Sequence, residues 1–258
     1  MNLIICTTPL QTLLAKEIVK TYEDEKFYGI LFSNHFSEKV DRYFNLFGVL
    51  CHILNKIYCK SSIKLVCLIL YYKIKFFNKK FDKIFVANIE NILIQSIISS
   101  LKFNELITFD DGTANILKNS MLYQNNESWK LKFIKFIFMI EHDINTLKDI
   151  SSLHYTIYDM DNIIKNTKRI SIFNFNNSVG NTLSGVLKIC LGQRLYNDDA
   201  KNVDLFKKII DKYNIDYYLP HPKESFVVDG VKYYDSDLIF EDIICNELNN
   251  YKEIYVYT

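Results

Sequence analysis

Short apolar runs alternate with helical patterns along most of this 258-residue chain. The runs that read as strands are 3–6, 27–32, 84–87, 106–109, 186–191, 215–219 and 253–257. The helical patterns cover 10–19, 37–46, 63–77, 89–101, 130–140, 203–213 and the segment around Ile239, Ile243 and Ile244. Strands that alternate with helices are typical of βαβ units. We therefore expect an α/β protein with mainly parallel, doubly wound sheets.

Residues 119–180 are polar and irregular by comparison with the rest of the chain, and the asparagine-rich run 174–181 reads as a linker. A new pattern of strands and helices begins after this run. We therefore expect a first Rossmann-like domain over residues 1–165 and a second over residues 181–258. Hydrophobic residues form 49% of the chain, which is enough to build a core in each domain.

Charge and cysteine usage exclude several classes of protein. The chain has 31 basic and 30 acidic residues, so no global field attracts nucleic acid. Its six cysteines form no CxxC pair and lie mostly in apolar runs, which is typical of a reducing cytosol. The apolar start at residues 3–6 is too short for a secretory signal or a membrane span. We expect a cytoplasmic protein without a nucleic-acid partner.

The segment 63–77 leaves two interpretations open. It contains the longest apolar run, residues 65–72, and the chain then becomes basic at Lys73, Lys75, Lys79, Lys80 and Lys83. A basic amphipathic stretch of this kind can rest on an anionic membrane surface, here the inner face of the cytoplasmic membrane. The simpler interpretation is a half-buried helix whose lysines keep it soluble.

Thr8 and Gln11 follow the first predicted strand. Thr8 precedes Pro9, and the pair is suited to start a helix because the hydroxyl caps it and proline fits its first position. The carboxyl end of a strand is also where open α/β sheets bind ligands, so both residues are candidates for a binding site. A capped first helix explains the same residues without a ligand.

Asp110, Asp111 and Gly112 follow the predicted strand 106–109. Glycine supplies the tight conformation with which a chain turns out of a sheet. Adjacent carboxylates repel, so either one has a raised pKa or both are satisfied by amide donors and a hydroxyl partner. The functional interpretations are a site for a base, for sugar hydroxyls or for a metal, and the alternative is a turn with a capping aspartate.

The segment from Tyr217 to Glu224 runs from an apolar strand into Pro220, His221 and Pro222. Each proline fixes its own φ and biases the preceding residue away from the helical region, so the segment is held extended. A histidine held in this way can be aimed at a ligand. The simpler interpretation is a strand that ends in a proline turn with a solvated imidazole.

The first strand of the second domain supplies a neighbour for His221. Gly192 closes that strand, and the following loop, 193–200, carries Asp198 and Asp199. The next strand delivers His221 at its carboxyl end. Because neighbouring parallel strands lie about 4.8 Å apart, the aspartate and the histidine can share one cleft.

Three of these segments, in this order, resemble motifs of the bacterial sialyltransferases of glycosyltransferase family 52. Residues 109–113 resemble the Asp/Glu-Asp/Glu-Gly motif, residues 220–222 the His-Pro motif, and residues 2–11 the first strand and helix of the family. The resemblance runs from Asn2 to Thr258. It implies a GT-B-like arrangement of two Rossmann-type domains, in which the second binds CMP-N-acetylneuraminate and the first a galactose-terminated glycan of lipooligosaccharide or capsule.

The resemblance also implies inversion at the anomeric carbon, a homodimer, and no metal or other cofactor. CMP leaves as a phosphate monoester, which one acid or a set of hydrogen-bond donors can stabilise. His221 matches the family's acid and Asp199 its base. Asp198 is an alternative base because the loop is longer than usual in the family. Asp110 and Asp111 are further alternatives, because related sialyltransferases use a carboxylate of this motif as the base. The residues expected to bind substrate are Thr8, Gln11, Asp110, Asp111, Gly112, Gly192, Pro222 and Glu241.

The remaining histidines, at positions 35, 52, 142 and 154, lack the spacing of a metal site and are expected to be structural.

One departure from the family pattern concerns the carboxyl terminus. Family members continue past the strand that matches 253–257 into a serine-bearing turn and a helix that bind the CMP phosphate, whereas this chain stops before that turn. The second domain is therefore expected to be incomplete, because losing a helix amino terminus removes an anion site. Two alternatives follow: a non-catalytic remnant of such an enzyme, or a GT-B transferase for another nucleotide sugar.

Overall fold

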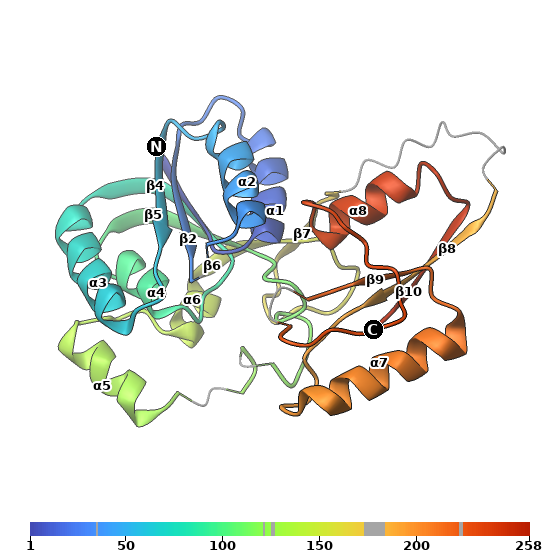
Figure 1. Cartoon of the computed structure of the whole chain (residues 1–258). Helices are drawn as coiled ribbons and strands as arrows, with labels where there is room; N and C mark the ends of the chain where they lie inside the picture. The colour runs from blue at the N-terminus through green and yellow to red at the C-terminus, as the bar shows by residue number, and fades with distance from the viewer. Residues whose placement is uncertain (35, 121, 125–126, 173–183, 222–223) are drawn as a thin grey trace. The chain divides into compact units, whose positions relative to one another are not determined.

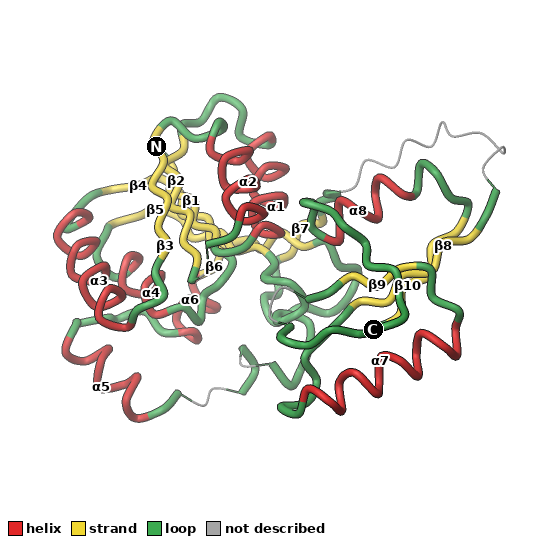
Figure 2. The backbone as a smooth tube through the Cα atoms, in the orientation of Figure 1, coloured by secondary structure: helices red, strands yellow, loops and turns green. Residues whose placement is uncertain are grey.

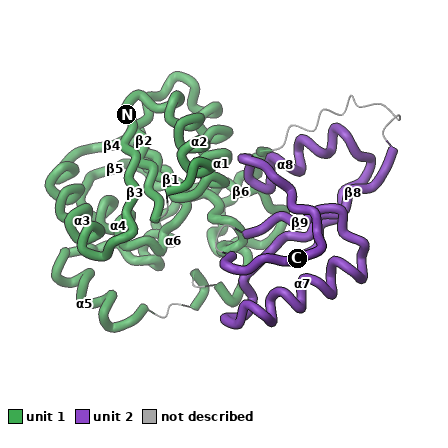
Figure 3. Tube along the Cα trace, viewed as in Figure 1, with its two compact units in different colours: residues 1–172 green, residues 173–258 purple. Residues whose placement is uncertain are grey.

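The computed structural model describes residues 1–34, 36–120, 122–124, 127–172, 184–221 and 224–258 (Figure 1). The chain divides into two compact units, residues 1–172 and 173–258 (Figure 3). Each unit is built on a parallel sheet with helices, which confirms the expected α/β class with Rossmann-type units. The asparagine-rich run 174–181 lies outside the described residues, as do His35 and Pro222.

The strands of the first unit are β1 (Asn2–Cys6), β2 (Phe27–Ser33), β3 (Ile53–Tyr58), β4 (Lys80–Val86), β5 (Lys102–Phe109), β6 (Ser151–Thr156) and β7 (Thr167–Arg169). Its helices are α1 (Pro9–Lys20), α2 (Glu38–Gly48), α3 (Ser62–Phe76), α4 (Ile92–Ile98), α5 (Trp129–Ile137) and α6 (Ile144–Ile150). The strand order is β3-β2-β1-β4-β5-β6-β7, and every neighbouring pair is parallel. The chain therefore reverses its direction of winding between β1 and β4, which makes this position the topological switch point.

Helices cover both faces of this sheet (Figure 2). Leu3 and Ile5 of β1 belong to one apolar cluster, which also includes side chains of α3 and α4. Ile4 and Cys6 belong to a second cluster with side chains of α1 and α2. Because successive side chains of a strand point to opposite faces, a strand covered on both faces must be apolar throughout. All five residues of β1 are buried, and all but Asn2 are apolar.

The expectation of an irregular segment over 119–180 was wrong, because α6, β6 and β7 lie within it. β6 continues the main sheet but has the sequence SSLHYT, without the apolar run of a typical buried strand. Its buried polar side chains, His154 and Thr156, are satisfied by hydrogen bonds to Asp110. A strand whose burial depends on a partner more than 40 residues away carries no local apolar signal.

The second unit contains β8 (Val186–Leu191), α7 (Asp199–Tyr213), β9 (Tyr217–Leu219), α8 (Phe240–Glu247) and β10 (Glu253–Tyr257). Its sheet has the order β10-β8-β9, and both pairs are parallel. Phe206 of α7 is fully buried, with its ring centroid 5.5 Å from that of Tyr218 and 6.2 Å from that of Phe226. These aromatic rings form the centre of the cluster between α7 and the sheet.

Helix α7 begins four residues before the expected start at Val203. The carboxylate of Asp198 accepts a hydrogen bond from the backbone N–H of Ala200 at 3.0 Å and so caps the helix. Asp199 then occupies the first turn, where a negative charge interacts favourably with the helix dipole. The assignment of Asp199 to a loop was therefore wrong, since it is the first residue of α7.

Among the described residues, no helix combines the length and the apolar character needed to cross a membrane.

Candidate active site

Polar residues that follow β1, β4 and β5 converge at the switch point of the first unit. Gln11, in the first turn of α1, is fully buried, and its Nε2 donates to Asp111 Oδ1 at 2.6 Å. Its Oε1 accepts from the backbone N–H of Thr7 at 2.5 Å. Asn88, just after β4, donates through Nδ2 to Asp111 Oδ2 at 2.9 Å. We call Thr7, Gln11, Asn88, Asp111 and the nearby Glu90 the switch-point cluster.

Two acids of the switch-point cluster are shifted towards their protonated forms. Burial raises the pKa of the Asp111 carboxyl, the hydrogen bonds from Gln11 and Asn88 oppose this, and the charge of Asp110 adds to it. Burial also raises the pKa of Glu90, and the charge of Asp111 contributes in the same direction. Glu90 Oε2 and Asn88 Oδ1 are buried and accept no hydrogen bond. The cluster thus holds buried acceptors that a hydroxyl group of a ligand would satisfy.

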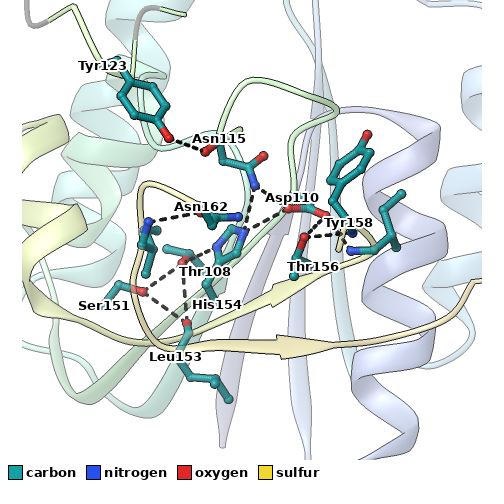
Figure 4. Close-up of polar contacts among 12 residues, drawn as sticks. Thr108, Asp110, Asn115, Tyr123, Ser151, Leu153, His154, Thr156, Tyr158 and Asn162 are labelled. Atoms are coloured by element: carbon teal, nitrogen blue, oxygen red, sulfur yellow. Dashed lines mark hydrogen bonds and ion pairs between the residues drawn. The ribbon is translucent and has the colours of Figure 1, made fainter. Parts of the chain in front are cut away.

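Asp110 lies in a different environment from its neighbour (Figure 4). Its carboxylate is fully buried, and Oδ1 accepts from Asn115 Nδ2 at 2.6 Å and lies 3.0 Å from His154 Nε2. Oδ2 accepts from the hydroxyl of Thr156 at 2.9 Å and from the backbone N–H of Ile157 at 2.7 Å. All of these partners belong to β6 or to loops of the same unit. Asp110 therefore ties the end of β5 to the end of β6.

His154 completes the Asp110 network. An ionised carboxylate can only accept, so the short contact with Asp110 requires His154 Nε2 to carry the hydrogen. His154 Nδ1 then accepts from the hydroxyl of Thr108, 2.8 Å away. The imidazole is buried and has a partner at each nitrogen, as expected of a structural histidine.

The two adjacent acids therefore combine both of the arrangements that their repulsion predicted. Asp111 has the raised pKa, and Asp110 is satisfied by amide donors and a hydroxyl. Gly112 follows them with φ +58°, a conformation that glycine adopts without strain. Thr8 caps α1 by accepting from the backbone N–H of Gln11 at 3.3 Å, so its hydroxyl already has a structural partner.

In the second unit, Glu224 fixes the backbone of His221. Its Oε2 accepts from the backbone N–H of His221 at 3.1 Å, and its Oε1 accepts from the hydroxyl of Tyr218 at 2.6 Å. The backbone N–H of Glu224 donates in turn to the carbonyl of His221 at 2.9 Å. Burial raises the pKa of Glu224, although the bonds from Tyr218 and His221 oppose the shift. The side chain of His221 is exposed at the carboxyl end of β9.

Gly192 makes room for this carboxylate. A Cβ atom at position 192 would lie 2.1 Å from Glu224 Oε1 and 2.5 Å from the hydroxyl of Tyr218. The backbone N–H of Gly192 donates to the carbonyl of Leu219 at 2.8 Å, which joins the ends of β8 and β9. The structure thus gives Gly192 a packing role, because the space beside it is filled by Glu224.

Asp199 faces the segment that follows His221. Its Oδ2 accepts from the hydroxyl of Ser225 at 2.9 Å, and its Oδ1 lies 3.5 Å from Arg194 Nη2. The preceding loop is held by the fully buried Asn202, which donates to the carbonyl of Asp198 at 3.2 Å. The second unit thus brings Asp199 and the His221 segment to the same end of its sheet.

Glu241 lies in the first turn of α8. Burial raises the pKa of its carboxyl, its own backbone N–H opposes the shift, and the charge of Asp242 adds to it.

Sequence reasoning missed four polar residues that shape these sites: Asn88, Glu90, Glu224 and Ser225. Asn88 directly follows the predicted strand 84–87, so its position at a strand end was a usable signal, whereas Glu90 falls in the predicted helix 89–101 and has no such signal. Glu224 lies within the proline segment, but nothing in the sequence indicates that it turns back onto His221. Ser225 carries no signal at all.

Within the described ranges, no group of three or more His, Cys, Asp or Glu side chains is arranged to hold a metal ion.

Replacing Asp110 should destabilise the fold much more than replacing Asp111. Asp110→Ala leaves Asn115, Thr156 and His154 buried without their acceptor, so we expect a loss of about 3–5 kcal/mol of unfolding free energy. Asp111→Asn keeps the shape and removes a half-buried charge, so we expect a loss of about 1 kcal/mol. Urea denaturation of the two variants measures the difference, and equal losses would contradict the structural role of Asp110.

The raised pKa of Glu90 predicts the pH dependence of stability. The folded state binds a proton more tightly than the unfolded state, so the unfolding free energy falls as pH rises from the ordinary value of 4.5 through the raised pKa. Glu90→Gln removes this titration, and its unfolding free energy should fall less over the same interval. Urea denaturation at a series of pH values tests this, with Glu23→Gln on the surface as the control. Parallel curves for Glu90→Gln and the wild type would refute it.

Comparison with known proteins places these sites in a family. The sequence profile of glycosyltransferase family 52 matches residues 24–258. Over its full length, the chain is 39% identical to a CMP-N-acetylneuraminate:β-galactoside α-2,3-sialyltransferase of Pasteurella multocida and covers 84% of that protein. It is 36% identical to an N-acetyllactosaminide α-2,3-sialyltransferase of Haemophilus influenzae and covers 85% of it. A Neisseria meningitidis protein with the same description is 28% identical, with 72% covered.

The profile match spans most of the chain and both units, and the similarity to two of these relatives extends from end to end at well over 30% identity. The chain belongs to glycosyltransferase family 52.

Proposed function

We propose that this enzyme transfers sialic acid from CMP-N-acetylneuraminate to a terminal galactose of a bacterial surface glycan, lipooligosaccharide or capsule. The observation that carries the proposal is the full-length similarity to sialyltransferases whose names specify this donor or a galactose-containing acceptor. The α2,3 linkage in those names is the one we propose here. We propose that the reaction needs no cofactor, because the donor already carries CMP as its leaving group.

Asp199 and His221 are the proposed catalytic residues. Asp199 accepts the proton of the galactose hydroxyl, whose oxygen forms a bond to the anomeric carbon of sialic acid. The bond from that carbon to the CMP phosphate breaks at the same time, and His221 protonates the departing phosphate oxygen. Attack opposite to the leaving group inverts the anomeric centre. Protonation by His221 stabilises the negative charge that develops on the departing phosphate. Enzymes with nucleoside diphosphate leaving groups usually use a divalent cation for this purpose, so we propose that the present reaction needs no metal.

The contacts of the two neighbouring acids support Asp199 over Asp198 as the base. The carboxylate of Asp198 caps α7 through Ala200. The carboxylate of Asp199 bonds instead to Ser225, four residues beyond His221. Asp199 is thus held towards the histidine segment, whereas Asp198 is occupied by its own helix.

Glu224 is a positioning residue in this proposal. It holds the backbone N–H of His221 and receives the hydroxyl of Tyr218, so it acts on the reaction through the placement of His221. Its carboxylate occupies the space beside Gly192, so a side chain at position 192 would displace it.

The switch-point cluster is the proposed binding site for acceptor hydroxyls. Asp111 and Gln11 were expected to bind substrate, and Asn88 and Glu90 extend the set with buried acceptors. The raised pKa of Asp111 moves it towards the neutral range in which a general base is most effective, so Asp111 is the alternative base. Glu241 is the proposed partner of the ribose or cytosine of CMP.

A homodimer and a peripheral position at the inner face of the cytoplasmic membrane stay predictions. The second is favoured by the chemistry of the proposed acceptor, since the glycan of lipooligosaccharide is anchored in a membrane.

The purified chain should form sialyllactose from CMP-N-acetylneuraminate and lactose in the presence of EDTA. Mass spectrometry of the product and the release of CMP measure the reaction, and the susceptibility of the product to an α2,3-specific sialidase tests the linkage. A strict requirement for a divalent metal would refute the mechanism. Transfer from a different nucleotide sugar in a donor panel would refute the proposed donor, and the absence of heat with millimolar CMP in calorimetry would indicate a non-catalytic chain.

His221→Ala and Asp199→Asn should each lower kcat by about 10²- to 10⁴-fold, which is the usual contribution of a general acid or base. Asp198→Asn is the matched control, because asparagine caps a helix as well as aspartate does and α7 stays intact. A strong loss in Asp111→Asn together with near-normal turnover in Asp199→Asn would transfer the role of the base to Asp111. Thermal melting of each variant verifies that it is folded.

A further inference from the structure

Arg194 is the one arginine in the sequence of the second unit. Residues 173–258 contain thirteen acidic and nine basic side chains, and eight of the nine basic ones are lysines. A unit with this balance does not attract an anion by its overall charge. The donor in the proposed function carries a phosphodiester and a carboxylate, both ionised at neutral pH. Its binding therefore needs cations that are placed locally, within the site.

Arg194 lies on a short loop that is fixed at both ends. At one end, the backbone N–H of Gly192 donates to the carbonyl of Leu219 at 2.8 Å. At the other end, the buried side chain of Asn202 accepts from the backbone N–H of Tyr196 at 2.9 Å and donates to the carbonyl of the same residue at 2.8 Å. Arg194 is two residues from each of these anchors. Its backbone is therefore held, while its side chain retains 45% of its full exposure.

The guanidinium of Arg194 lies beside the carboxylate of Asp199. Nη2 of Arg194 is 3.5 Å from Oδ1 of Asp199, and this oxygen is buried and accepts no hydrogen bond within the described part of the chain. The other oxygen, Oδ2, accepts from the hydroxyl of Ser225 at 2.9 Å. Arg194 thus interacts with Asp199 through charge, and its N–H groups stay available as hydrogen-bond donors to a ligand.

A cation at this position is close to where the reaction has to take place. The acceptor hydroxyl that gives its proton to Asp199 attacks the anomeric carbon of sialic acid, and reacting atoms approach to about 3–3.5 Å before the bond forms. The carboxylate of sialic acid is attached directly to that same carbon. A guanidinium in contact with the base is therefore within reach of the carboxylate of the donor.

We propose that Arg194 binds the carboxylate of the sialic acid in the donor. The planar guanidinium matches a carboxylate and can form two parallel hydrogen bonds with it, whereas a lysine ammonium acts as a point charge. The contact orients the anomeric carbon towards the acceptor hydroxyl, and it distinguishes this donor from nucleotide sugars without a carboxylate. The inference rests on the proposed function and makes Arg194 a residue that determines donor specificity.

Lysines of the second unit are less suited to this role. Lys188 donates through Nζ to the carbonyl of Tyr213 at 2.9 Å, and Lys232 donates through Nζ to the hydroxyl of Tyr217 at 2.8 Å. Lys201 is exposed in the first turn of α7. It is therefore the competing cation that the experiment has to include.

Steady-state kinetics of Arg194 variants test the proposal. Arg194→Gln should raise the KM for CMP-N-acetylneuraminate by about 10- to 100-fold, which is the usual effect of losing a hydrogen-bonded contact between charged groups, and should leave the KM for lactose unchanged. Arg194→Lys keeps the charge without the planar fork and should restore only part of the donor affinity. A fall in kcat with an unchanged donor KM would show that Arg194 only orients Asp199, and would overturn the proposal.

Matched variants separate Arg194 from other surface cations. Arg169→Gln removes an exposed arginine that forms an ion pair with Asp159 in the first unit, so it should leave the donor KM unchanged. Lys201→Gln should also leave it unchanged. A larger effect of Lys201→Gln than of Arg194→Gln would assign the carboxylate to the lysine and overturn the proposal. Thermal melting verifies that each variant is folded.

Calorimetry with CMP separates the carboxylate of the donor from its phosphate. Arg194→Gln should bind CMP as tightly as the wild type does, because CMP lacks the carboxylate. Equal losses of affinity for CMP and for the donor would assign Arg194 to the phosphate and overturn the proposal.

A donor analogue whose carboxylate is replaced by a carboxamide gives the complementary test. The wild type should use the analogue about 10- to 100-fold less efficiently than the natural donor, and Arg194→Gln should use the two equally well. Equal discrimination by the wild type and the variant would overturn the proposal. A wild-type chain that transfers no sialic acid would refute the proposed function and this inference with it, whereas an active wild type with an unchanged donor KM in Arg194→Gln would overturn this inference alone.

Discussion

The parallel pairing of β1 with both β2 and β4 is the constraint on which the first unit depends. Ile4 of β1 lies opposite Gly29 of β2 and opposite Phe85 of β4, so β1 is enclosed on both edges as well as on both faces. Because the strands are parallel, the carboxyl ends of β1, β4 and β5 lie at the same end of the sheet. Gln11 and Asn88 can meet Asp111 for this reason, although the three residues are far apart in the sequence.

Asp110 and Asp111 show how two adjacent carboxylates acquire different tasks. They leave β5 in succession, so their side chains point in different directions and meet different partners. Asp110 points into a buried network in which every contact is made by the protein itself. Asp111 points towards Gln11 and Asn88, which follow β1 and β4. Burial there disfavours its charge, and the neighbouring acceptors Asn88 Oδ1 and Glu90 Oε2 receive no hydrogen bond. The carboxylate of Asp110 is used by the fold, and Asp111 is the one that we propose to contact the acceptor.

The sequence allowed accurate prediction where the signal is local. The strands β8 and β10 were predicted with the same limits as in the structure, and Thr8 with Pro9 correctly placed the start of α1. The start of α7 was misplaced because the apolar pattern begins at Val203, whereas the helix is started by the cap of Asp198, which has no apolar periodicity. β6 was missed because its buried polar residues depend on Asp110, a contact across 44–46 positions.

The candidate site was predictable to a similar extent. The positions of Asp111 and His221 just after strands followed from the alternation of strands and helices, as did that of Gln11 in the first turn of the helix after β1. The distinction between Asp110 and Asp111, or between Asp198 and Asp199, could not follow from it, because it depends on the direction of each side chain.

The close approach of Glu224 to Gly192 constrains how this family member can evolve. Any side chain at position 192 would displace the Glu224 carboxylate, which would then lose its bonds to Tyr218 and to the backbone of His221. A shorter residue at position 224 would make room for a larger one at 192, but it would also release His221. Neither single substitution, in whichever order the two occur, therefore leaves the histidine held. We expect positions 192 and 224 to be inherited as a pair in lineages that retain His221.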